Sequence, residues 1–206
     1  MIMFVLVGIA HAPIAYGAAD KTLVSWVHLE DESVRAGSIL TLQNGSEFDG
    51  IVFGELMTGK WMAGSDNWKR SEKNQEKYPD KDSAAGSLVQ IAIVYQKDLI
   101  SIFREGNPYA SYSATNIDLL SKDNNFAVFG KRHMGGGGGI SGMIEDARIY
   151  DRALTINEIK ELVPNELSEI KPYAWWSFED DASEQTGRFP HHELRIGARV
   201  KNGKLM

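Results

Sequence analysis

Short runs in which apolar and polar residues alternate make up most of the chain from Lys21 onward. Alternation with a period of two is typical of β-strands that bury one face, and helical periodicity is almost absent. Strands are predicted over residues 22–27, 37–42, 51–53, 88–95, 99–104, 109–113, 126–129, 143–150 and 173–178, with one or two more between 194 and 205. The pattern therefore predicts an all-β sandwich or barrel.

Turn residues separate these runs at intervals that suit antiparallel hairpins. Asn44-Gly45 lies between two apolar runs, and this dipeptide is the strongest short hairpin signal. Residues 96–98 and 105–108 turn three successive strands into an antiparallel meander. The five consecutive glycines Gly135–Gly139 predict a loop, because their backbone freedom disfavours regular structure.

Two segments depart from the strand pattern. Thr155 and Glu158 have the spacing of a helix-capping box, and Pro164 cannot continue a helix, so one short helix is predicted near residues 156–163. Residues 65–87 are polar, charged and long for a plain connection. We expect this segment to be a surface loop of functional interest.

Composition and charge narrow the class of protein. A chain of 206 residues with 5 tryptophans can bury one good core, so one domain is expected. The net charge is −6, and no Lys/Arg run interleaves with aromatic residues, which argues against a nucleic-acid partner. The absence of cysteine excludes disulfides and thiolate zinc sites.

The first 19 residues carry no charged side chain and include an apolar stretch over 2–10, followed by small residues. This pattern predicts a signal peptide over residues 1–19 and a secreted or periplasmic protein. The alternative is a buried N-terminal strand. The apolar stretch is too short to span a bilayer, and no later segment is apolar enough, so no membrane association is expected.

Several blocks of sequence, in this order, resemble the laminin-G-like jelly-roll family. The blocks are Leu23–Val27, Gln90–Tyr95, Ile102–Gly106, and Gly142–Thr155 with Glu158-Ile159. The resemblance implies a concanavalin-like jelly-roll sandwich of two antiparallel sheets. It implies a single domain over residues 20–206 with its core at 21–163.

The tail changes the order of elements. Members of that family usually open with a strand similar to Ala174–Glu179, which here comes after the predicted helix. Either residues 173–206 complete the first sandwich by circular permutation, or they start a truncated second module. We favour the first alternative, because an unpaired strand that carries Trp175, Trp176 and Phe178 would expose a large apolar area.

The order of blocks is also similar to the N-terminal region of secreted bacterial glycoside hydrolases of the levanase and β-fructosidase type. In those enzymes such a module precedes the catalytic domain. This similarity implies a downstream catalytic domain as partner and a fructan as the polysaccharide.

Catalysis by this chain alone is not expected. Glycosidases with this fold place their carboxylates on alternate residues of one strand, so that both project into one groove. Glu145 and Asp146 are adjacent and therefore face opposite sides of a sheet. We expect Asp146 to pair with Arg148 in a structural role. The face of Glu145 is expected to carry Met143, Ala147 and Ile149.

Candidates for sugar binding combine flat aromatic rings with polar groups. Trp61, Trp68 and Tyr78 could stack on sugar rings. For Trp61, packing in the core is favoured over an exposed position, whereas Trp68 lies in the polar segment and is the better candidate. The accompanying polar candidates are Asp66, Asn67, Lys69, Arg132 and His133.

No cofactor is expected to be required, although calcium is common in this fold. It would be bound by loop oxygen atoms. The weak candidates, none with a diagnostic spacing, are Asp49, Asp66, Asn67 and the turn Asp123–Asn125.

The leading hypothesis is a non-catalytic module that binds a polysaccharide for a glycoside hydrolase. A protein-interaction or spacer module is the first alternative, and it predicts that Trp61, Trp68 and Tyr78 are buried. A stand-alone hydrolase or lyase is the second, and it predicts convergent carboxylates or a His/Tyr/Arg cluster in one groove.

Overall fold

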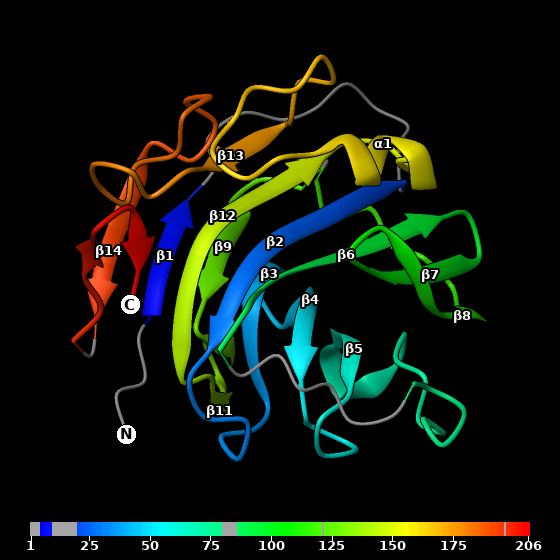
Figure 1. Cartoon of the computed structure of the whole chain (residues 1–206). Helices are drawn as coiled ribbons and strands as arrows, with labels where there is room; N and C mark the ends of the chain where they lie inside the picture. The colour runs from blue at the N-terminus through cyan, green and yellow to red at the C-terminus, as the bar shows by residue number, and fades with distance from the viewer. Residues whose placement is uncertain (1–4, 10–19, 80–85, 121, 196) are drawn as a thin grey trace.

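The computed structural model describes residues 5–9, 20–79, 86–120, 122–195 and 197–206, which form a sandwich of two antiparallel sheets (Figure 1). The six-stranded sheet has the order β14 (His191–Arg195), β1 (Val5–Ile9), β9 (Phe126–Phe129), β3 (Gly37–Asn44), β4 (Glu47–Phe53), β5 (Trp61–Ser65). The 8-stranded sheet has the order β15 (Val200–Lys201), β16 (Lys204–Leu205), β12 (Gly142–Tyr150), β2 (Lys21–Leu29), β6 (Leu88–Gln96), β7 (Leu99–Arg104), β8 (Asn107–Ser113), and β13 (Ala174–Trp176) pairs with β12. This architecture confirms the predicted jelly-roll sandwich.

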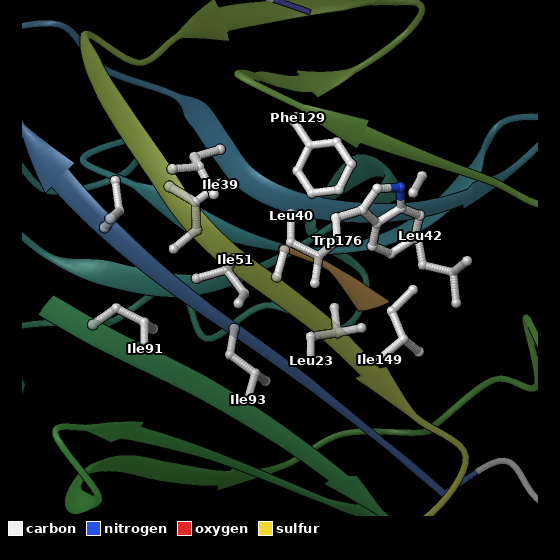
Figure 2. Packing of buried hydrophobic residues seen from close by; sticks show 14 of the residues in the cluster. Leu23, Ile39, Leu40, Leu42, Ile51, Ile91, Ile93, Phe129, Ile149 and Trp176 are labelled. Atoms are coloured by element: carbon white, nitrogen blue, oxygen red, sulfur yellow. The ribbon is translucent and has the colours of Figure 1, made fainter. Parts of the chain in front are cut away.

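The main core lies between the two sheets. Leu23 and Ile93 from the 8-stranded sheet and Leu42 and Ile51 from the six-stranded sheet are fully buried in one cluster (Figure 2). On β6, for example, every second residue from Val89 to Tyr95 belongs to this cluster, which explains why an alternating pattern predicted the strand. Burial of each such side chain contributes about 1.5–3 kcal/mol, so this cluster is the main source of stability.

A second cluster covers the other face of the 8-stranded sheet. Helix α1 (Ile156–Glu161) lies over this face, and Ile159 packs there against Trp26 and Val94. The helix is shorter than predicted because Leu162 already has an extended backbone, with ψ at 128°. Among the described residues there is no helix long and apolar enough to cross a membrane.

The predicted capping box at the start of α1 is present. The Glu158 amide donates to Thr155 Oγ1 at 3.3 Å, and the Thr155 amide donates to Glu158 Oε2 at 2.7 Å. Thr155→Ala should therefore lower the free energy of unfolding by about 1 kcal/mol. Urea titration would measure the change, with Thr155→Ser as the control that keeps the hydroxyl. Equal losses in both variants would contradict a capping role.

The tail packs into the same core as the rest of the sandwich. Strand β13 is antiparallel to β12, with Trp175 opposite Arg148. Trp176 and Phe178 are fully buried, with ring centroids 5.2 and 5.5 Å from that of Phe129. The large aromatic side chains of the tail are thus covered by this sandwich, as expected if the tail completes it. Circular permutation, a statement about strand order in relatives, stays a prediction.

An N-terminal strand takes part in the six-stranded sheet. β1 lies between β9 and β14 and is antiparallel to both, with Leu6 opposite Phe129 and Leu194. Of the predicted signal peptide, residues 1–4 and 10–19 lie outside the described residues. The pairing of β1 agrees with the alternative of an N-terminal strand, and the signal peptide stays a prediction.

The glycine run corrects one prediction. Gly136–Gly139 form strand β11, which pairs with β10 (Lys131–His133) in a two-stranded sheet, whereas we expected a loop. The reason is a close approach of two backbones: a Cβ on Gly138 would stand 1.9 Å from the carbonyl oxygen of Arg35. Only glycine leaves room for this contact.

Candidate functional site

A pocket of about 720 Å³ opens on the outer face of the six-stranded sheet. Its floor includes Gln43, Phe48 and Phe126, whose positions alternate with those of the core residues Leu42 and Ala127. One wall is the 3-10 turn η1 (Asp66–Trp68), which follows β5. The opposite wall is residues 132–135, the end of β10 and the turn toward β11.

Five of the eight residues proposed from sequence meet in this pocket, although they come from segments 64 positions apart in the chain. They are Asp66, Asn67, Trp68, Arg132 and His133. Trp68 is 38% exposed, and the guanidinium carbon of Arg132 lies 5.8 Å from the centroid of its ring. The pocket thus combines an accessible indole with charged and amide side chains.

Trp61 and Tyr78 lie elsewhere. Trp61 is in the core, as its favoured alternative predicted, whereas the expectation that Tyr78 offers an exposed ring is corrected. Trp61 is fully buried against Phe53, with ring centroids 4.7 Å apart, because the strand alternation of β5 points it into the core. Tyr78 is 9% exposed and packs edge-on against Tyr109 at 5.6 Å. Both rings serve packing.

His133 and Phe48 form an aromatic pair in the pocket. Their rings are stacked, with centroids 4.9 Å apart and an interplanar angle of 24°. The Gly135 amide donates to His133 Nδ1 at 3.0 Å, and Arg132 Nη2 lies 3.4 Å from His133 Nε2. Phe48, Gln43 and Phe126 also line the pocket and were not predicted from the sequence. Phe126 lies on a predicted strand, whereas Gln43 and Phe48 lie just outside the predicted strands 37–42 and 51–53, so the strand pattern gave a signal for Phe126 alone.

The charged groups at the pocket are already paired. Arg132 forms an ion pair with the buried carboxylate of Glu55. Asp66 accepts from Arg70 at 2.7 Å and lies 3.0 Å from Lys69 Nζ. Burial alone raises the pKa of Asp66, but the hydrogen bonds and charges of Arg70 and Lys69 outweigh it and hold this pKa below its ordinary value. The carboxylate of Asp66 is therefore ionised at neutral pH and already bound by Arg70 and Lys69.

A pH effect is expected from His133. Burial, together with the charges of Arg132 and Lys131, lowers the pKa of His133 below its ordinary value of 6.5. The folded protein therefore binds this proton more weakly than the unfolded chain. The associated stability is present above pH 6.5 and is lost as the pH falls through the folded-state pKa.

His133→Gln should accordingly reduce the fall in unfolding free energy between about pH 7 and about pH 5. Urea titrations of both proteins across this range would measure the slope. An unchanged slope in the variant would show that His133 does not contribute to it.

The acidic pair on β12 has a structural role. Arg148 donates to both oxygens of Asp146, at 3.0 and 2.8 Å, which confirms the predicted pairing. Glu145 lies 3.1 Å from Lys204 Nζ. A β-bulge between Ile144 and Asp146 shifts the alternation. Ile144 and Ala147 therefore both face the core, and the expectation that Met143 and Ala147 share a face was wrong.

Three of the calcium candidates, Asp49, Asp66 and Asn125, are bonded within the protein. Asp49 is fully buried, 3.1 Å from Lys21 Nζ and 2.9 Å from Arg70 Nε. The side-chain Nδ2 of Asn44 donates to the Asp123 carbonyl oxygen at 2.7 Å and to Asn125 Oδ1 at 3.1 Å. The part of the chain that the structure describes contains no group of three His, Cys, Asp or Glu residues suited to a metal. Calcium binding stays a prediction.

Solved structures share this fold at low sequence identity. A protein of Bacteroides ovatus ATCC 8483, described as a candidate carbohydrate-binding protein, has a TM-score of 0.66 and 11% identity over 98% of this chain. This chain spans 62% of that protein. A heptameric SAP-like pentraxin from Limulus polyphemus has a TM-score of 0.54 and 13% identity, over 92% of this chain and 94% of its own.

A third similar structure is domain 4 of an extracellular arabinanase from Geobacillus stearothermophilus, solved in complex with arabinotriose. Its TM-score is 0.54 at 17% identity, over 70% of this chain and 66% of its own. No curated protein matches the sequence. A sequence-family model for laminin-G-type domains of the concanavalin A-like lectin/glucanases superfamily matches residues 8–160. The chain therefore belongs to the concanavalin A-like lectin/glucanases superfamily.

Proposed function

We propose that this chain is a non-catalytic carbohydrate-binding module that holds a saccharide in the pocket between η1 and β10. The observation that carries the proposal is the accessible indole of Trp68 beside a pocket lined by other rings and by polar groups. An exposed aromatic face suits the apolar faces of sugar rings, while amide, imidazole and guanidinium groups suit their hydroxyls.

Two of the similar structures support the saccharide class. The arabinanase domain was solved with arabinotriose, and the Bacteroides ovatus protein is described as a candidate carbohydrate-binding protein. The pocket volume of about 720 Å³ lies within the range of small-molecule sites and would admit a short oligosaccharide.

The state of the carboxylates supports a non-catalytic role. Hydrolysis of a glycosidic bond usually needs two carboxyl groups about 5–9.5 Å apart across the substrate. In the described part of the pocket, Asp66 is the acidic lining residue, and it is bound by Arg70 and Lys69. Asp146 is fully buried and bound by Arg148.

The finer part of the proposal concerns the parent protein. The similarity of the order of blocks to the N-terminal region of levanase-type enzymes supports a secreted or periplasmic glycoside hydrolase with a downstream catalytic domain, and a fructan as the glycan. These assignments rest on the resemblance alone. The residues that line the pocket would suit many neutral sugars and do not select a fructan.

The protein-interaction or spacer module remains the second candidate function. One observation favours it: Trp61 and Tyr78 are buried, as that hypothesis predicts. The exposure of Trp68 runs against it, since the same hypothesis predicts that this ring is buried as well.

Binding of the full chain to levan, inulin and arabinan, with release of reducing sugar assayed in the same tubes, tests the proposal. Retention on a glycan without turnover is the expected result. Release of reducing sugar would contradict the non-catalytic role. No retention on any of the three glycans would favour the spacer module.

A further inference from the structure

The segment that carries Trp68 has an unusual backbone. Asn67 and Trp68 are consecutive and both left-handed, with φ of 49° and 54°. Residues with a side chain disfavour this region, and a bulky aromatic residue is rarely found there. The conformation of η1 therefore depends on contacts that the surrounding protein supplies.

Arg70 supplies these contacts. Its guanidinium donates to Asp66 Oδ1 at 2.7 Å, to the Phe48 carbonyl oxygen at 2.8 Å and to Asp49 Oδ1 at 2.9 Å. Its own amide donates to Ser65 Oγ at 2.9 Å. Arg70 thus ties both ends of the left-handed pair to strand β4.

The same contacts continue into the other sheet. The second carboxylate oxygen of Asp49 lies 3.1 Å from Lys21 Nζ on β2. Lys21 also donates to Asn116 Oδ1 at 3.0 Å and lies over the Tyr95 ring at 4.4 Å. Asp49, Lys21 and Arg70 are each at most 5% exposed. A buried chain of alternating charges therefore connects the interior of the sandwich to the pocket wall.

We infer that Arg70 is a positioning residue of the pocket, which acts through η1 to hold the indole of Trp68 opposite Arg132. Arg70 itself is buried and is not one of the residues that line the pocket. The inference rests on the proposed function only for its consequence in sugar binding. The position of the Trp68 ring can be measured without any glycan.

The rival explanation is that Arg70 contributes to stability alone. Arg148 offers a matched control, because it is also a buried arginine bound to a carboxylate. It lies on β12, and its guanidinium contacts the rings of Trp26 and Trp175. A change at Arg148 should thus affect a different pair of tryptophans.

The experiment is ¹⁹F NMR of the full chain labelled with 5-fluorotryptophan, with each resonance assigned by a Trp→Phe variant. In Arg70→Lys, the Trp68 resonance should shift, and it should broaden or split, while Trp26 and Trp175 keep their positions. In Arg148→Lys, the Trp26 and Trp175 resonances should move while Trp68 stays.

An unchanged Trp68 resonance in folded Arg70→Lys would overturn the inference, as would an equal change of Trp68 in Arg148→Lys. If Arg70→Lys does not fold, Asp66→Asn is judged by the same criterion, because it weakens the 2.7 Å bond without removing the guanidinium. Failure of all three glycans to bind would contradict the proposed function while leaving the ¹⁹F result as it stands.

Discussion

Replacing Arg148 with alanine is expected to lower the free energy of unfolding by about 3–5 kcal/mol. Asp146 would keep its charge inside the protein, where it is fully buried, and would lose the partner that donates to both of its oxygens. A buried charge without a partner is costly because water cannot replace the lost hydrogen bonds.

The expected loss is large because Arg148 joins several segments. Its guanidinium also donates to the carbonyl oxygens of Val163 and Glu166, at 2.7 and 3.0 Å. It lies between the rings of Trp26 and Trp175, 5.2 and 5.3 Å from their centroids. The side chain therefore connects β12 to β2, to β13 and to the segment after α1.

Denaturant titration monitored by circular dichroism would measure the change. Arg195→Ala is the control, because Arg195 pairs with Glu193 on the exposed strand β14. Ion pairs between exposed side chains contribute little to stability, so this variant should be nearly as stable as the parent. Similar small losses in both variants would contradict the structural importance of the Asp146–Arg148 pair.

Trp68→Ala should weaken glycan binding about tenfold, which corresponds to about 1.4 kcal/mol, and leave folding stability within about 0.5 kcal/mol. The physical reason is that the indole is 38% exposed at the pocket and contributes little to the core. Binding to levan, inulin and arabinan can be followed by affinity electrophoresis, and stability by thermal unfolding.

Trp61→Ala is the matched comparison. Trp61 is fully buried between the sheets, so this variant should lose about 3–5 kcal/mol of stability. A loss of stability in Trp68→Ala with unchanged glycan binding would assign Trp68 a packing role and favour the spacer module.

The alternation of apolar and polar residues predicted the positions of most strands, but it predicted few of the residues that line the pocket. Alternation located β2, β6 and β12 because one face of each strand packs against a buried cluster. The same rule misassigned the residues around Glu145, because a bulge inserts one extra residue that no local pattern reveals. The glycine strand β11 was missed for a related reason, since its partner contact at Arg35 is about 100 residues away.

Side-chain chemistry predicted Trp68, Arg132 and His133 as sugar-binding candidates, and the structure brings these three residues together in one pocket. The polar segment around Trp68 favoured this residue over Trp61 as the functional ring, and packing in the core was favoured for Trp61. Whether a ring faces the core or the solvent depends on the strand to which it belongs and on the layer packed against it.

By itself, the amino-acid sequence determined the class of fold, the positions of most strands along the chain, the helix cap and the pairing of Asp146 with Arg148. These features depend on local periodicity and on residues a few positions apart. Only the tertiary structure decided that the tail joins the first core, that Trp61 is buried and that Phe48 and His133 stack in one pocket. Those outcomes depend on contacts between distant segments, whose energies appear only when the two sheets pack together.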